Sequence, residues 1–279
     1  MRLTPEQAQQ LLDEYGSIAE LARRLNRNER SLRRWLKRHL PEAYAREPAQ
    51  ELTIGVISDT HLASRYASIE ALNRFYDLCQ QRNITTVLHC GDFLDGLNVY
   101  RGHLAELALP ASLDAHITYA VENYPRREGI KTLVLAGNHD TSYIKTGGLN
   151  PLPIIAQQRD DIEHLGDLYA TIKLAGVRIG LAHPEAGLTQ AISYRAQKFV
   201  DAMPPQERPD ILLTGHYHTT GYFVYQGVHI ILCGTTQHQT PYLRRKGLRP
   251  AISACILTIT TRGGKVERFM PEFITLEAE

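Results

Sequence analysis

The stretch that decides the fold reads TIGVISDTHL over residues 53–62, where an apolar, β-branched run ends in polar residues. The same pattern recurs in TTVLHCGDFLDG over residues 85–96 and in TLVLAGNHD over residues 132–140. These runs predict strands at Leu52–Ser58, Ile84–Cys90 and Thr132–Ala136, and Ser68–Gln81 between the first two has helical spacing. The order is typical of a βαβ unit, whose sheet is buried and whose polar loops lie at the carboxyl ends of the strands.

The second half of the chain predicts antiparallel hairpins. Tyr169–Ala182 would turn at Ala175-Gly176, Tyr222–Cys233 at Gln226-Gly227, and Ile252–Phe269 at Gly263-Gly264. One mixed sheet, or two packed sheets with helices outside them, accounts for both halves.

Five polar groups follow apolar runs and offer seven candidate metal ligands. Their carboxylate, amide and imidazole side chains suit Mn, Fe or Zn, and no cysteine joins them. Seven ligands exceed the needs of one metal and suit two metals that share a carboxylate. The candidates are Asp59, His61, Asp92, Asn138, His183, His216 and His218. His183 has the shortest block, and Pro184 beside it also suits a simple turn.

In order, these blocks read D-x-H, G-D-x-x-D, G-N-H-D, H and G-H-x-H, and they resemble the calcineurin-like metallophosphoesterase superfamily over residues 53–235. The resemblance implies a four-layer α/β/β/α sandwich, hence an α/β fold class. It also implies that one metal is held by Asp59, His61 and His218. Asn138, His183 and His216 would hold the other, and Asp92 would bridge them.

The resemblance implies two-metal hydrolysis of a phosphate ester. A metal-bound hydroxide would attack phosphorus, because a bound metal lowers the pKa of water from 15.7 to about 7. His139 would act as general acid toward the leaving oxygen. Asp95 would hydrogen-bond His139 and keep it protonated. Six other histidines fit no block, and we expect surface or core roles for them, with His103 and His238 next in line as substrate contacts. They are His89, His103, His116, His164, His229 and His238.

Two positions depart from the phosphoprotein-phosphatase branch of this family. That branch has an arginine directly after the second aspartate of G-D-x-x-D and reads G-N-H-E. Here these residues are Gly96 and Asp140. The missing phosphate-binding arginine disfavours a protein phosphatase and favours the nuclease and small-diester branches, between which the core motifs do not choose.

The first 41 residues predict three short helices that resemble a helix-turn-helix domain. Thr4-Pro5-Glu6, Ser17–Glu20 and Asn28 are helix-start signals. Residues 23–38 hold eight Lys/Arg and one acid, Glu29. In the resemblance, residues 28–38 form the recognition helix. A solvated helical cap, or a role in packing or dimerisation, is the alternative. The candidate nucleic-acid contacts are Arg30, Arg33, Arg34 and Lys37.

These signals divide the chain into a helix-turn-helix-like domain at 1–41, a linker at 42–50 and a metallophosphoesterase domain at 51–279. Residues 96–131 form a long connection that could add a substrate-shaping helix. Arg101, Arg126, Arg127 and Lys131 within it could extend a basic track, and a solvated face is the alternative. No apolar run approaches the ~18 residues of a membrane span. Four scattered cysteines and no secretory signal predict a cytoplasmic protein.

Three functions fit these observations. The leading hypothesis is a metal-dependent phosphodiesterase or nuclease acting on DNA, with two divalent ions, Mn²⁺ first and Fe or Zn as alternatives. The second is a small-molecule phosphodiesterase or phosphatase whose front domain serves assembly. The third is a DNA-binding regulator with an inert phosphoesterase body, which the intact ligand set disfavours. The oligomeric state stays open.

Overall fold

The computed structural model describes residues 3–15, 17–41, 49–185, 187 and 191–277. Its first part consists of helices α1 (Pro5–Tyr15), α2 (Ile18–Arg24) and α3 (Glu29–His39). Ser17 Oγ accepts from Glu20 N at 3.2 Å, and Asn28 Oδ1 accepts from Ser31 N at 3.1 Å. The predicted helix starts at these two residues are therefore confirmed.

The three helices pack around an apolar core that shares no residue with the cores of the body. Leu21, Leu32 and Leu36 are fully buried there, and Trp35 packs against them. Because α3 places Leu32 and Leu36 one turn apart, they form one apolar face, as the i, i+4 spacing predicts. The segment that joins these helices to the body is outside the described residues.

The basic face of α3 differs from the expectation at one of its four candidate contacts. Arg33 is only 9% exposed, because its guanidinium packs against Glu29 and forms an ion pair with it at 2.8 Å. Glu20 also pairs with Arg23 and Arg24 of α2, so more than one acid faces the cations of residues 23–38. Arg30, Arg34 and Lys37 have exposed side chains.

A six-stranded mixed sheet forms the first half of the body, in the order β11-β10-β1-β2-β3-β4. Its central strands β1, β2 and β3 are parallel to one another. At one edge, β10 pairs antiparallel with β1, and β11 pairs antiparallel with β10. The strands are β1 (Gln50–Ile57), β2 (Thr86–His89), β3 (Lys131–Ala136), β4 (Ile162–Asp167), β10 (Ser253–Arg262) and β11 (Lys265–Thr275). All three expected strands of the βαβ pattern are present.

A five-stranded sheet forms the second half, in the order β5-β6-β7-β9-β8. β5–β6 and β8–β9 are antiparallel hairpins, and β7 runs parallel to both β6 and β9. The strands are β5 (Tyr169–Leu174), β6 (Val177–Ala182), β7 (Ile211–Thr214), β8 (Gly221–Tyr225) and β9 (Val228–Leu232). The three predicted hairpins turn where expected, at positions with positive φ such as Ala175 and Gln226.

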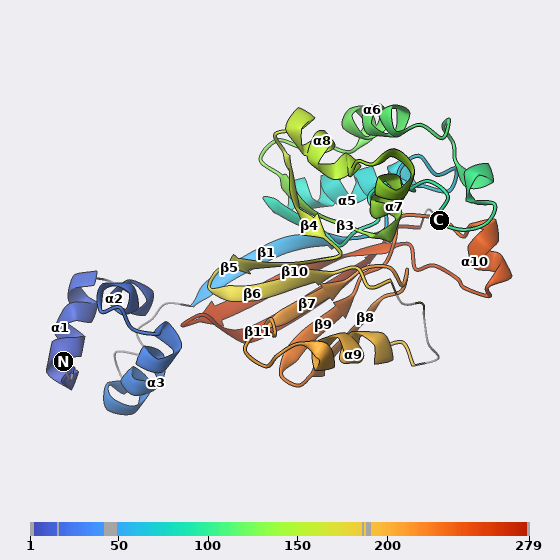
Figure 1. Cartoon of the computed structure of the whole chain (residues 1–279). Helices are drawn as coiled ribbons and strands as arrows, with labels where there is room; N and C mark the ends of the chain where they lie inside the picture. The colour runs from blue at the N-terminus through green and yellow to red at the C-terminus, as the bar shows by residue number, and fades with distance from the viewer. Residues whose placement is uncertain (1–2, 16, 42–48, 186, 188–190, 278–279) are drawn as a thin grey trace.

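The two sheets face each other, and helices cover their outer faces, so the body is a four-layer α/β/β/α sandwich (Figure 1). Side chains alternate along each strand: Ile54 and Val56 of β1 face the other sheet, whereas Ile57 faces the helices. The outer elements are α5 (Ile69–Gln81), η1 (His103–Glu106), α6 (Leu113–Asn123), α7 (Asn138–Gly147), α8 (Pro151–Gln158), α9 (Tyr194–Ala202) and α10 (Pro241–Arg245).

Three of the four cations suggested as a basic track in residues 96–131 form ion pairs at the surface. The alternative prediction, an exposed solvated face, describes them better. Arg126 pairs with Asp160, Arg127 with Asp77 at 2.7 Å, and Lys131 with Glu163. The acids come from β4, α5 and the turn before β4, which the sheet brings beside these cations. These three charges are therefore neutralised locally, whereas Arg101, the fourth cation of the suggested track, is exposed.

Within the described part of the chain, no helix combines the length and apolar character that a membrane crossing requires. All four cysteines are buried and free.

Candidate metal centre

The candidate ligands lie at the carboxyl ends of strands from both sheets. Asp59 and His61 follow β1, and Asp92 and Asn138 follow β2 and β3 of the six-stranded sheet. His183 follows β6, and His216 and His218 follow β7 of the five-stranded sheet. Parallel strands end at the same edge of a sheet. Because these edges of the two sheets lie next to each other, all seven side chains come together.

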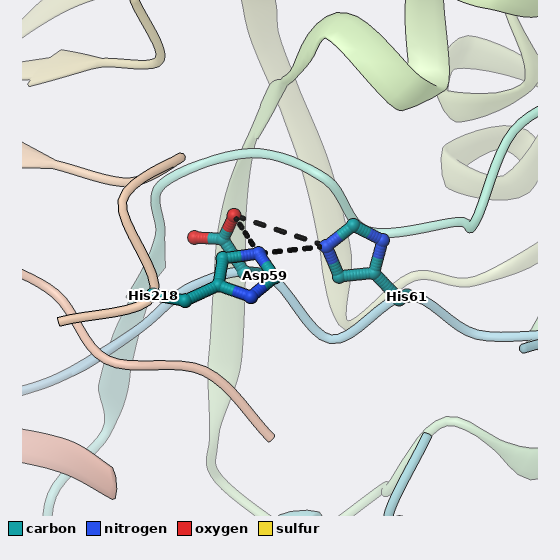
Figure 2. Close-up of side chains that lie close together, drawn as sticks. All are labelled: Asp59, His61 and His218. Carbon is teal, nitrogen blue, oxygen red and sulfur yellow. Dashed lines mark hydrogen bonds and ion pairs between the residues drawn. The ribbon is translucent and has the colours of Figure 1, made fainter. Parts of the chain in front are cut away.

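The first cluster consists of Asp59, His61 and His218 (Figure 2). His218 Nε2 lies 3.1 Å from Asp59 Oδ1 and 3.1 Å from His61 Nε2, and His61 Nε2 lies 3.9 Å from Asp59 Oδ1. His61 Nδ1 lies 3.0 Å from Asp95 Oδ1, so it is the donor there and Nε2 keeps its lone pair. Three lone-pair atoms thus converge, which is the donor set that a divalent cation fits.

The second cluster consists of Asp92, His183 and His216, with Asn138 beside it. His183 Nδ1 donates to Cys90 O at 2.8 Å, which turns Nε2 toward the other cluster residues, 3.0 Å from Asp92 Oδ2. His183 Nε2 is buried and makes no hydrogen bond within the described chain. His216 Nδ1 lies 2.9 Å from Asn138 Oδ1. His183, whose sequence block was shortest, therefore lies with the other candidates, and its orphaned nitrogen fits a metal.

Five of the seven candidate ligands have positive φ angles, a region that residues other than glycine seldom adopt. The residues are Asp59 (53°), His61 (45°), Asp92 (53°), His216 (76°) and His218 (49°). Each such conformation costs on the order of 1 kcal/mol, and such costs concentrate at functional sites. The fold holds these five side chains in position against that cost.

Two glycines allow the loops to approach this closely. A Cβ on Gly137 would lie 2.1 Å from Asp92 Oδ1, and one on Gly91 would lie 2.3 Å from His183 Nδ1. Because real Cβ atoms do not approach so closely, the glycines of the G-D and G-N-H blocks are needed for packing as well as for turns.

Burial and nearby charges shift the pKa values of the cluster residues in different directions. Burial raises the pKa of Asp59, but the charges of His218 and His183, with the hydrogen bond to His218, together lower this pKa to about 2. Burial lowers the pKa of His216 to about 4. Burial also lowers the pKa of His183, but the charges of Asp92 and Asp59, with the hydrogen bond to Cys90 O, together raise it to about 10. This proton on His183 occupies the position beside Asp92 that a cation would take.

The predicted hydrogen bond between Asp95 and His139 uses the main-chain oxygen of Asp95 instead of its carboxylate. His139 Nδ1 contacts the main-chain oxygen of Asp95, and its distance to Asp95 Oδ1 is 3.8 Å. Burial lowers the pKa of His139 to about 4, so Asp95 does not keep this ring protonated. The carboxylate lies closer to His61, whose Nδ1 is 3.0 Å from Asp95 Oδ1, and the rings of His61 and His139 contact each other with centroids 4.5 Å apart.

Two side chains that support Asp95 are missing from the sequence blocks. His103 Nε2 lies 3.3 Å from Asp95 Oδ2, and Gln237 Nε2 donates to Asp95 Oδ1 at 3.1 Å. His103 is 1% exposed, so it orients a carboxylate instead of contacting substrate. His238, the other residue suggested as a substrate contact, is exposed and does not line the cavity at the site.

Asp140 joins the loops that carry Asp92 and Asn138. Its carboxylate accepts from the N–H groups of Phe93 (3.0 Å), Leu94 (2.8 Å) and Gly137 (2.8 Å). These three donors explain why an acid, aspartate here and glutamate in another branch, ends the G-N-H block.

We expect Asp140→Asn to destabilise the protein, because an amide NH₂ group would face backbone donors that then lose an acceptor. The loss should be about 1–3 kcal/mol, which lowers Tm by roughly 2–4 °C per kcal/mol at this size. Thermal unfolding measures it. Asp77→Asn, at an exposed carboxylate that pairs with Arg127, is the control. An unchanged Tm in Asp140→Asn would contradict the linking role.

Both clusters open into one cavity of about 270 Å³. It is lined by His61, Asp92 and His139 of the candidate site and by residues of segments that follow other strands. The walls include Tyr100, Ile192, Tyr242, Leu243, Leu248 and Arg249. The cavity therefore gives a ligand access to the site from one side.

Residues 52–262 match the calcineurin-like phosphoesterase superfamily domain. The chain belongs to this superfamily. The match covers the strands that carry all seven candidate ligands, and it ends before β11. Membership agrees with the four-layer fold and with the presence of two His/Asp clusters at the strand ends.

The chain is also similar to proteins named DNA polymerase II small subunit. That of Methanothermobacter thermautotrophicus is 26% identical over 257 residues, 73% of this chain and 51% of the relative. That of Halobacterium salinarum is 22% identical, covering 82% of this chain and 53% of the relative. The chain thus spans about half the length of these curated relatives. A solved structure described as a novel archaeal phosphodiesterase is 16% identical, with 80% of this chain and all of that chain covered and a TM-score of 0.43.

Proposed function

We propose that the protein is a phosphodiesterase that uses two divalent metal ions and acts on DNA. One observation carries the proposal: two clusters of lone-pair donors lie side by side, with Asp92 between them, at the floor of an open cavity. Asp92 Oδ2 is 3.0 Å from His183 Nε2 and 3.8 Å from His61 Nε2, so it can reach both positions.

Asp59, His61 and His218 would hold one ion, and Asn138, His183 and His216 the other, with Asp92 shared. When bound, two such ions polarise the phosphate and lower the pKa of a water nucleophile. Mn²⁺ is our first candidate, because carboxylate, amide and imidazole ligands suit it, and Fe or Zn also fit.

His139 is the side chain positioned to exchange a proton with the leaving oxygen. Its ring lines the cavity, with Nδ1 against the main-chain oxygen of Asp95, so Nε2 is the atom that can face a ligand. Its main-chain N–H donates to Asp92 Oδ1 at 2.8 Å, which fixes the ring beside the shared carboxylate. Asp95 orients His61, a metal ligand, and His103 and Gln237 orient Asp95.

Two observations support DNA as the substrate. The curated relatives carry the name of a DNA polymerase subunit. At the front of the chain, α2, a four-residue turn and α3 have the order of a helix-turn-helix unit, and Arg30, Arg34 and Lys37 of α3 are exposed. We propose that residues 1–41 form a DNA-binding domain, that 42–50 link it to the body, and that the protein acts in the cytoplasm.

The relatives' names also favour a second role, as the accessory subunit of a DNA-synthesising assembly. This role does not require hydrolysis. In this role the metal clusters would not hydrolyse a substrate, so the hydrolysis assay described below separates the two roles.

The Mn²⁺-loaded protein should hydrolyse DNA and a generic aryl phosphodiester. A form that begins at Ala49 keeps all of β1 and should keep turnover of the aryl ester, since α1–α3 have a core of their own. It should bind DNA more weakly, because phosphate contacts dominate such affinity.

Single-stranded DNA, duplex DNA and RNA are compared as substrates in the same buffer. If DNA stays intact while both forms hydrolyse the aryl ester equally, the DNA phosphodiesterase proposal is wrong and the small-molecule alternative stands. If neither substrate is hydrolysed, the accessory role remains.

A further inference from the structure

Residues 237–251 form a segment whose two ends are tied to the metal centre. At its start, the Gln237 side chain donates to Asp95 Oδ1 at 3.1 Å. At its end, Ala251 N donates to His218 O at 2.7 Å. Between them the chain forms α10 and a turn, in which Leu248 N donates to Leu243 O at 2.9 Å. The segment is therefore held beside the cavity by the same residues that shape the site.

This segment carries four exposed cations, which we call the basic rim: Arg244, Arg245, Lys246 and Arg249. In the part of the chain that the structure describes, none of the four forms an ion pair, and Arg249 lines the cavity. The sequence explains this, since no acid occurs between Asp210 and Glu267. Lys246 Nζ lies over the Tyr242 ring, 5.9 Å from its centroid, which joins the rim to the aromatic residues. A group of like charges without ion pairs beside a cavity favours a polyanion.

An aromatic wall faces the same cavity. The rings of Tyr100 and Tyr242 are stacked, with centroids 4.1 Å apart and planes at 19°. Glu106, which is 6% exposed, accepts from Tyr100 OH at 2.7 Å and from Tyr242 N at 3.2 Å. The buried carboxylate thus holds the Tyr100 hydroxyl and the Tyr242 main chain, and the two rings stack on each other.

We propose that the basic rim and the Tyr100–Tyr242 wall bind a single DNA strand. The rim would hold backbone phosphates next to the scissile one, and the wall would receive an unpaired base. An aromatic side chain can stack only on a base that is not already stacked inside a duplex. The combination of the wall with the rim therefore favours a single strand. This inference rests on the proposed function and specifies its substrate class.

The test measures binding without turnover, using the full chain with Mn²⁺ and a phosphorothioate thymidine oligonucleotide of about 20 nucleotides, which resists hydrolysis. The variant Arg244→Gln, Arg245→Gln, Arg249→Gln removes three rim charges. The slope of log K against log salt should become shallower by about 2, since each single-strand phosphate contact contributes about 0.7. The control, Arg126→Gln, Arg127→Gln, Lys131→Gln, removes three paired cations and should leave the slope unchanged.

Tyr242→Ala tests the wall separately. It should weaken binding of the single strand about 10-fold or more, because stacking on one aromatic side chain contributes that much. Binding of a duplex should change little. An unchanged salt slope in the rim variant, or equal losses on both DNA forms in Tyr242→Ala, would overturn the inference. Cleavage of ordinary DNA is scored apart, so the proposed function can fail while the strand-binding surface stands, and the reverse.

Discussion

Asp92→Asn should reduce bound metal to fewer than two ions per chain and lower phosphodiester hydrolysis by about 10³-fold or more. The shared carboxylate lies 3.0 Å from His183 Nε2 and 3.8 Å from His61 Nε2, so its charge serves both clusters. Losing several kcal/mol of charge stabilisation corresponds to a rate loss of this order.

Metal content is measured after loading with Mn²⁺ and dialysis, and activity on an aryl phosphodiester in parallel. Asp77→Asn makes the same chemical change at an exposed carboxylate and should keep both metal and activity. Thermal unfolding of Asp92→Asn checks that the chain is folded. Two ions per chain in the folded variant would mean that Asp92 does not bridge.

His139→Ala should keep both metal ions and slow the hydrolysis of esters with poor leaving groups by about 10²–10⁴-fold. The contact of residue 139 with Asp92 uses the main-chain N–H at 2.8 Å, which alanine retains. The metal clusters should therefore survive the loss of the ring. Nitrophenyl esters have a good leaving group and should slow much less.

The measurement compares kcat on an alkyl and a nitrophenyl phosphodiester for each protein. His39→Ala removes an exposed ring at the end of α3 and is the matched control. Equal losses on both esters in His139→Ala would exclude proton transfer to the leaving oxygen and leave only a positioning role for His139.

The basic rim was within reach of sequence reasoning. The absence of any acid between Asp210 and Glu267, against six Lys/Arg in the same span, is visible in the printed sequence. The eight Lys/Arg of residues 23–38 form a denser basic segment, which is why the sequence favoured α3 as the basic surface. A count in windows along the whole chain would have shown residues 244–249 as a second basic segment.

Sequence alone determined the local elements and the identity of the candidate ligands. Helix starts at Ser17, Ser68 and Asn28 and the hairpin turns at Ala175 and Gln226 depend on interactions within a few residues, so the printed order carries them. The ligands could be predicted because each comes directly after a strand, and strand ends meet at one edge.

Only the tertiary structure decided what depends on segments far apart in the chain. Packing between distant segments decides that β1 and β6 belong to different sheets. It also brings Asp95 to His61, 34 residues away, and Arg127 to Asp77, 50 residues away. The periodicity of a sequence does not predict which distant side chains pack together, because that depends on how the whole core packs. For this protein, the sequence determined which residues are candidates for binding metal and phosphate, and the fold decided which of them face one another.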